Sequence, residues 1–121
     1  MRCISDVTSV SRSIRSMVRG IRTFACSRNP LAVSSSVEMK TNNYFSHTGL
    51  NNSNPGERIT AAGYTWQAYG ENIANGYTTE QAVVDGWLNS EGHCKNIMNA
   101  NFKDMGVGRD GNYWTQEFGE Q

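Results

Sequence analysis

Residues 105–118, with the sequence MGVGRDGNYWTQEF, predict a β-hairpin near the end of the 121-residue chain. The dipeptide Asp110-Gly111 supplies the positive φ angles of a tight two-residue turn, so strands are expected at Met105–Arg109 and Asn112–Phe118. Successive side chains of a strand point to opposite faces of the sheet. One face of the second strand therefore carries Trp114, Gln116 and Phe118, and the other carries Tyr113, Thr115 and Glu117.

Helix start signals precede this hairpin at three places. Asn29-Pro30 predicts a helix through about Thr41, and Asn54-Pro55 with Glu57 predicts a short helix that ends at Gly63. Thr78 and Gln81 form a capping-box pattern for a third helix, which carries Val83, Val84, Trp87 and Leu88 on its inner face. A short helical turn is expected after Gly92, through Ile97. The polar stretch 46–54 between the first two helices is expected to be a loop.

Two further segments complete the expected architecture. Val7, Val10, Ile14, Met17 and Ile21 recur at steps of three and four residues, which predicts an amphipathic helix at the start of the chain. The aromatic-rich segment Tyr64–Tyr69 reads as a strand. Helices on both sides of a small, mostly antiparallel sheet give an α+β fold, a three-layer α-β-α sandwich. Trp66, Trp87 and Trp114 are expected to fill its core.

The composition suits one compact soluble domain over residues 1–121, which we expect to be a monomer. The formal net charge is zero, and the basic residues concentrate before residue 41 without forming the surface that nucleic acid requires. No apolar run approaches the length of a transmembrane span. We therefore expect no nucleic-acid partner and no transmembrane segment.

The three cysteines, Cys3, Cys26 and Cys94, are too widely separated for a zinc-finger pattern. Their odd number allows one disulfide with one thiol left over. Three reduced thiols and one disulfide staple are both compatible with the sequence, and they correspond to a reducing and an oxidising compartment respectively.

The candidate functional residues are the two histidines of the chain and a glutamate between them in sequence. His47 begins the polar loop, and His93 follows Gly92 beyond the third helix, so both lie at element ends where functional side chains are commonly displayed. Glu71 lies in or at the entrance of a strand, where a buried carboxylate needs a partner. Imidazole titrates near neutral pH, so the trio could bind a divalent metal, relay protons, or form structural hydrogen bonds.

Five motifs occur in the order seen in the CAP superfamily, which includes cysteine-rich secretory proteins, insect venom antigens and plant pathogenesis-related proteins. They are Phe45–Gly49, Gly70–Ala74, Trp87–Met98, Gly106–Gly108 and Tyr113–Gly119. The sequence resembles a bacterial-type member strongly over residues 38–119 and weakly over residues 1–30. The resemblance implies an α-β-α sandwich and an extracellular or cell-envelope location, with any export signal outside this sequence.

The resemblance also implies a central cleft with two histidines and two acidic residues, which binds zinc or another divalent cation in some members. His47, Glu71 and His93 match three of these positions, with His47 and His93 as the metal ligands. The fourth falls at Ser90, with Glu91 one residue later, so either Glu91 substitutes for the missing acid or the site is a triad. The resemblance further suggests a disulfide between Cys94 and either Cys3 or Cys26.

Three functions remain compatible with these residues. The first is an extracellular binding module for a lipid, sterol, peptide or envelope component. The second is a metal-assisted protease or esterase that uses His47, Glu71, Glu91 and His93 in the same cleft. The third is a structural or interaction domain without catalysis.

Overall fold

The computed structural model describes Arg22–Thr23 and residues 30–121. The helix expected over residues 7–21 lies outside these residues. The helices are α2 (Pro30–Thr41), α3 (Pro55–Ala61), α4 (Glu80–Leu88) and α5 (Glu91–Met98). The strands are β1 (Arg22–Thr23), β2 (Ala68–Asn75), β3 (Asp104–Asp110) and β4 (Tyr113–Glu120).

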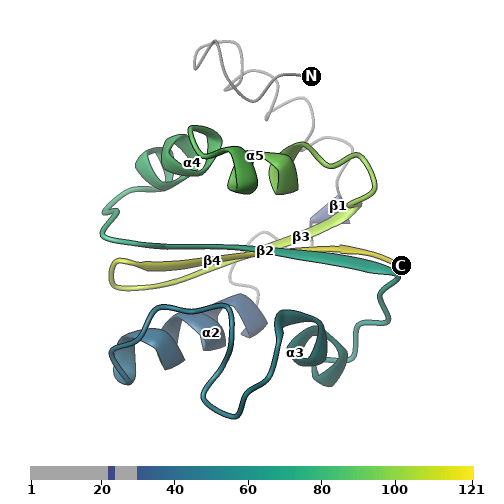
Figure 1. The fold of residues 1–121 in the computed structure, drawn as a ribbon, viewed down its shortest axis with the longest axis horizontal. Coiled ribbons are helices and arrows are strands. Elements are labelled where there is room, and N and C mark those ends of the chain that lie inside the picture. Colours follow the sequence, from purple (N-terminus) through teal and green to yellow (C-terminus); the bar gives the residue numbers. More distant parts are fainter. Residues whose placement is uncertain (1–21, 24–29) are drawn as a thin grey trace.

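The four strands form one sheet in the order β1-β3-β4-β2. The predicted hairpin is confirmed: β3 and β4 pair antiparallel across a turn in which Gly111 has a φ of 57°. β2 is antiparallel to β4, and the two-residue β1 is parallel to β3. Helices α4 and α5 cover one face of this sheet, and α2 and α3 cover the other (Figure 1). The expected three-layer sandwich with a mostly antiparallel sheet is therefore confirmed.

Helix α2 packs against the hairpin through small residues. Ala32 and Ser36 are fully buried, and the Ser36 hydroxyl lies 2.8 Å from Oγ1 of Thr115. A Cβ at Gly108 of β3 would collide with the backbone of Ala32 and Val33. This close approach explains how a helix with few large apolar side chains can still cover the sheet.

The opposite layer holds a cluster of buried hydrophobic residues. Ala74, Val83, Trp87 and Trp114 form one buried cluster between α4 and the sheet. Trp66, which was expected in the core, is 36% exposed, and its indole Nε1 donates to Gly56 O of α3 at 3.0 Å. The prediction for Trp66 was therefore wrong, whereas those for Trp87 and Trp114 are confirmed.

Two predicted boundaries need correction. The strand expected at Tyr64–Tyr69 begins only at Ala68 and continues to Asn75, because the aromatic segment before it packs back on α3. Helix α4 is capped by Thr79, whose side chain accepts from Ala82 N at 3.1 Å, and not by Thr78. The capping box of Asn54 and Glu57 at α3 is present as expected.

Side chains from α4 and α5 cover the free edge of β2. Trp87 Nε1 donates to Ile73 O at 3.1 Å, and Asn96 Nδ2 donates to Glu71 O at 3.2 Å. These bonds satisfy carbonyl groups that an edge strand would otherwise leave unpaired within the sheet. Nearby, Cys94 is buried and disulfide-bonded, while Cys3 and Cys26 lie outside the described residues.

Within residues 30–121 and the short β1 strand, no helix has both the length and the apolar character needed to cross a membrane.

Candidate functional site

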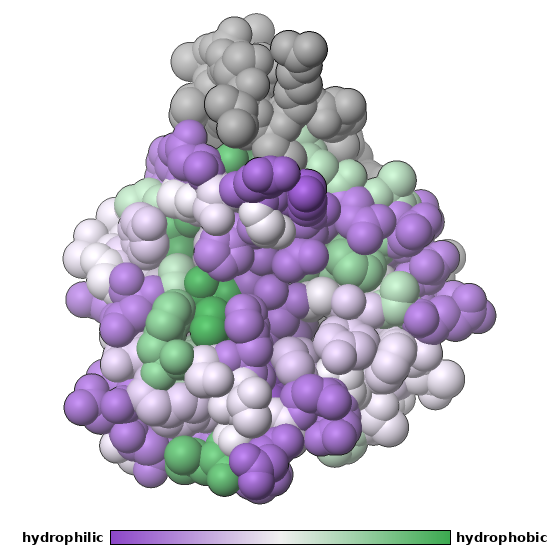
Figure 2. All heavy atoms as spheres, viewed as in Figure 1, coloured by the Kyte–Doolittle hydropathy of each residue, from purple (hydrophilic) through white to green (hydrophobic). Residues whose placement is uncertain are grey.

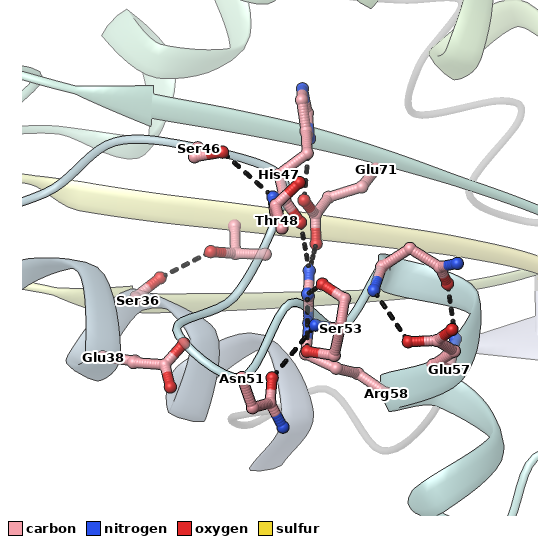
Figure 3. Close-up of polar contacts among 12 residues, drawn as sticks. Ser36, Glu38, Ser46, His47, Thr48, Asn51, Ser53, Glu57, Arg58 and Glu71 are labelled. Carbon is pink, nitrogen blue, oxygen red and sulfur yellow. Dashed lines mark hydrogen bonds and ion pairs between the residues drawn. The ribbon is translucent and has the colours of Figure 1, made fainter.

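Glu71 is the centre of a polar cluster at the edge strand β2. Its side chain is only 2% exposed, yet both carboxylate oxygens have partners. Oε1 lies 2.7 Å from Nδ1 of His47, and Oε2 lies 3.0 Å from Nη2 of Arg58 (Figure 3). The buried carboxylate is thus paired on both sides, as a buried charge requires.

Arg58 connects this carboxylate to the loop that carries His47. Besides its bond to Glu71, Nη2 donates to His47 O at 2.9 Å, and Nη1 donates to Ser53 O at 2.8 Å. Figure 3 shows the guanidinium of Arg58 reaching from α3 between the loop and Glu71. The planar guanidinium can serve several acceptors in a fixed geometry, so Arg58 fixes both ends of the loop to the strand.

The His47 loop also has its own internal bonds. Gly49 N donates to Ser53 O at 2.9 Å, and Ser53 N donates to Oδ1 of Asn51 at 3.1 Å. Asn52 has a φ of 61°, a left-handed conformation that asparagine tolerates. The loop is therefore a closed turn, and it presents a His47 side chain that remains 51% exposed.

Glu117 lies directly opposite Glu71 on the neighbouring strand β4. The residue is 5% exposed, and a side-chain hydrogen bond between its carboxyl group and that of Glu71 contributes to the pKa shifts of both. Burial, together with the adjacent Glu71 carboxylate, raises the pKa of Glu117 to about 10. Glu117 is therefore a neutral carboxylic acid at neutral pH.

The pKa of Glu71 is shifted in the opposite direction. Burial opposes its ionisation, but the bond with His47, the neighbouring Glu117 and the charge of Arg58 together outweigh burial and hold its pKa below the usual value. The two facing glutamates thus have opposite protonation states, because His47 and Arg58 both contact Glu71 directly.

His93 lies on α5, on the other face of the sheet from Arg58. Its backbone carbonyl accepts from Asn72 Nδ2 at 3.1 Å, and Asn96 Nδ2 donates to Asn72 Oδ1 at 2.9 Å. Burial, and secondarily the charge of His47, lowers the pKa of His93.

Glu91, the candidate for the fourth position, is not brought to this cluster. Its carboxylate pairs with Nζ of Lys95 at 3.0 Å, one helical turn later, and both side chains are more than 70% exposed. Ser90 precedes α5 as its N-cap, without a side-chain capping bond. From the predicted set, the structure pairs His47 with Glu71, whereas the contact recorded for His93 is the bond from Asn72 to its backbone carbonyl.

The residues that the sequence analysis missed are Arg58 and Glu117. A signal for Arg58 was available, because a buried Glu71 needs a cation and only four basic residues follow position 41. Glu117 could have been paired with Glu71 only after the register between β2 and β4 was known.

The cluster does not fit a three-ligand zinc site. Both oxygens of Glu71 are occupied by His47 and Arg58, and the described residues contain no group of three or more His, Cys, Asp or Glu side chains arranged to hold a metal ion. Structural and catalytic zinc sites use at least three protein ligands. Cation binding by His47 and His93 stays a prediction, and the described residues provide no third side chain as a ligand.

The pattern of the cysteine-rich secretory protein family (CAP) matches residues 25–118. Two curated relatives come from Bacillus subtilis strain 168. The uncharacterized protein YkwD is 45% identical over 85 residues, covering 69% of this chain and 33% of YkwD. The uncharacterized membrane protein YlbC is 43% identical over 88 residues, covering 73% of this chain and 25% of YlbC. The chain thus spans a third or less of these relatives.

Two solved structures are also similar to this chain. An extracellular protein containing an SCP domain from Bacillus anthracis superposes with a TM-score of 0.79 at 36% identity, covering 89% of this chain and 37% of that protein. An outer surface protein of Borrelia burgdorferi has a TM-score of 0.74 at 20% identity, covering 100% of this chain and 96% of that protein, which shows a shared fold. The family pattern covers most of the chain, including the His47, Glu71 and His93 motifs, and the chain therefore belongs to the cysteine-rich secretory protein (CAP) family.

Proposed function

We propose that this CAP domain acts outside the cytoplasm as a binding module for a polar component of the cell envelope, recognised at His47 and His93. The observation that carries the proposal is the pairing of His47 with Glu71. A buried carboxylate fixes the imidazole through Nδ1, while half of the His47 side chain remains exposed. A ring that is held on one side and open on the other is suited to recognition.

The chemistry of the two rings favours a polar ligand. With Nδ1 paired to the Glu71 carboxylate, the His47 ring leaves Nε2 for a hydrogen bond with a ligand. The lowered pKa of His93 favours a neutral ring, whose unprotonated nitrogen accepts hydrogen bonds. Hydroxyl and amide groups of a glycan or peptide are matching donors. Figure 2 shows a mainly hydrophilic face in which hydrophobic residues form small, separate groups, without the large apolar patch that marks a lipid-binding surface.

The proposed location draws support from relatives and from Cys94. The similar Bacillus anthracis protein is extracellular, the Borrelia burgdorferi protein is an outer surface protein, and YlbC is a membrane protein. Cys94 is disulfide-bonded, which is typical of proteins that mature in oxidising environments.

Co-sedimentation with purified peptidoglycan sacculi tests the proposal. We expect the wild-type chain to pellet with sacculi, and His47→Ala or His93→Ala to weaken binding about tenfold, the equivalent of one lost hydrogen bond. Glu91→Gln is the matched control, because Glu91 is exposed and pairs with Lys95 on the surface of α5. Unchanged binding by a His47→Ala/His93→Ala variant, or binding to lipid vesicles in preference to sacculi, would contradict the proposal.

Hydrolysis is a second candidate, favoured by the same His47–Glu71 pair. A carboxylate that orients an imidazole is the arrangement of a general base, which would activate water because no hydroxyl or thiol in the described part of the chain is hydrogen-bonded to either ring. Turnover of an ester or peptide substrate should then fall in Glu71→Gln. Turnover that is equal in Glu71→Gln and wild type would exclude this pair as its source.

Zinc binding is tested separately from both functions. Zinc titration followed through the ring resonances of His47 and His93 should shift both together if an ion bridges them. Resonances that stay unchanged in millimolar zinc would remove the prediction.

A further inference from the structure

A second candidate site is a surface groove between α3 and the segment that enters β2, which we call the Trp66 groove. Trp66 and Tyr69 contribute aromatic rings to its lining, and Asn54, Glu57 and Thr60 contribute polar side chains. Trp66 is 36% exposed, so part of its indole surface is open to a ligand. The groove therefore combines an exposed aromatic ring with polar groups on one surface.

The indole of Trp66 is fixed in place although part of it is exposed. Its Nε1 donates to Gly56 O and to Oγ1 of Thr60, each at 3.0 Å. The ring lies edge-to-face with Tyr69, with a centroid distance of 4.6 Å and an interplanar angle of 76°. Both rings pack against Gly56, where an added Cβ would lie 2.5 Å from Cε1 of Tyr69 and 2.9 Å from Cζ2 of Trp66. A ligand at this ring therefore has little side-chain freedom left to restrict.

Glu57 gives the groove a negative charge. In the described part of the chain it is the one charged residue that lines the groove, and it forms no ion pair there. Its Oε2 accepts from Asn54 N at 3.1 Å in the capping box, which leaves acceptor sites and the charge itself for a ligand. Arg58, the basic residue of α3, is directed to Glu71 instead (Figure 3).

The indole ring and the carboxylate select the same class of ligand. The face of an indole is electron-rich and attracts cations more strongly than the other aromatic side chains do. The charge of Glu57 adds Coulomb attraction for a cation and repels an anion. A primary ammonium is compact and strongly hydrated, whereas an alkylated ammonium presents methyl groups that pack on an aromatic ring. The pair therefore favours an alkylated ammonium over a neutral or anionic group.

We infer that the Trp66 groove binds an alkylated ammonium group, with its methyl groups against the indole of Trp66 and its charge beside the Glu57 carboxylate. The inference goes beyond the proposed recognition of envelope polymers at His47 and His93, because other residues and another ligand charge are involved. Loss of sacculus binding in the histidine variants and loss of ammonium binding in the groove variants are separate results, so each proposal can fail alone.

Choline and its uncharged isostere 3,3-dimethylbutan-1-ol test the inference on the full chain at pH 7. The isostere has carbon in place of the ammonium nitrogen, so the two probes differ in charge and hardly in shape. We expect choline to bind with a Kd on the order of 1–10 mM and to shift the indole N–H resonance of Trp66 in NMR spectra. The isostere should bind about fivefold more weakly, since it lacks the attraction of the ring and the carboxylate for a cation.

Three variants separate the charge, the ring and a general loss of negative charge. Glu57→Gln removes the charge and keeps the helix cap, because glutamine at this position can also accept from Asn54 N. It should weaken choline binding about fivefold and leave the isostere within about twofold. Trp66→Leu should weaken choline binding about tenfold. Glu91→Gln is the matched control, because it removes the same formal charge from an exposed pair with Lys95 and should leave choline binding unchanged.

Four results would overturn the inference. They are equal affinity for choline and its isostere, unchanged choline binding in Glu57→Gln, no shift of the Trp66 indole resonance in 100 mM choline, or N-acetylglucosamine binding more tightly than choline. The last result would assign the groove to a sugar ring. If Trp66→Leu does not fold, the comparison of wild type with Glu57→Gln and Glu91→Gln still decides the outcome, since neither of these two variants alters the packing of the rings.

Discussion

Glu71 and Glu117 face each other across neighbouring strands, but Glu71 is held as a carboxylate and Glu117 as a neutral acid. His47 and Arg58 contact Glu71, at 2.7 Å and 3.0 Å respectively. Two facing carboxyl groups in a buried site cannot both be ionised at low cost, so Glu117, which lacks these two contacts, keeps its proton.

The first prediction concerns Glu117 and rising pH. Its folded-state pKa of about 10 exceeds the ordinary 4.5, so between these values the unfolded chain releases a proton that the folded chain keeps, and wild-type stability falls with pH. Glu117→Gln lacks this proton. Its free energy of unfolding relative to wild type should therefore increase from pH 5.5 to 8.5, by at most about 1.4 kcal/mol per pH unit. Urea unfolding at each pH measures the difference, and parallel curves would contradict the protonation state assigned to Glu117.

The second prediction concerns the Glu71 carboxylate. Glu71→Gln leaves Arg58 without its buried counter-charge and should reduce the free energy of unfolding at pH 7 by about 3 kcal/mol. Because the folded pKa of Glu71 is lowered, its contribution is present above the unfolded pKa of about 4.5 and is lost as pH falls through the folded value. Urea unfolding at pH 7 and pH 3 should therefore show a smaller difference at pH 3. Glu91→Gln, which breaks only an exposed pair, should remain within about 0.5 kcal/mol of wild type.

The third prediction concerns the coupling of the two histidines. His47→Ala should raise the pKa of His93, since it removes the repulsion between the two rings, but the value should stay below 6.5 because burial remains. Titration of the histidine ring resonances by NMR measures the shift. Lys95→Ala is the control on the same helix, with an exposed side chain. A His93 titration that is identical in wild type and His47→Ala would show that the rings are not coupled.

The fourth prediction compares two glycines. At Gly108 an added Cβ would meet the backbone of Ala32 and Val33, which cannot move without displacing α2 from the sheet. Gly108→Ala should therefore destabilise the domain severely, by about 3 kcal/mol or more. At Gly92 of α5, by contrast, nothing lies within 4 Å of an added Cβ. Gly92→Ala should stabilise by about 0.5–1 kcal/mol, and thermal unfolding of both variants tests the comparison.

Most of the secondary structure was accessible from local sequence signals. The Asp110-Gly111 turn and the Asn54-Pro55 start act through the dihedral preferences of the residues themselves, so the hairpin and α3 appeared where predicted. The start of β2 was misplaced because the aromatic side chains of Tyr64–Tyr69 suit a strand, but Trp66 bonds instead to α3. A preference for extended structure cannot reveal which element a side chain will contact.

The candidate site was predictable only in part. His47, Glu71 and His93 were identified by their motifs, but Glu91 was considered for the fourth position because it lies beside Ser90 in the sequence. In the structure Glu91 projects to the exposed surface with Lys95, and Arg58 takes the position against Glu71. A helix rotates neighbouring residues by about 100°, so sequence adjacency does not decide which side chain reaches a strand.

The sequence by itself determined the local elements, the three-layer architecture and the identity of the two histidines and Glu71, because turns, caps and motifs act over a few residues. Only the tertiary structure decided how these residues are paired and charged. The register of β2 against β4 places Glu117 opposite Glu71, and the packing of α3 brings Arg58 to one of the two carboxyl groups. Burial then fixes opposite protonation states, because the ionisation of a carboxyl group depends on neighbours that are distant in the sequence.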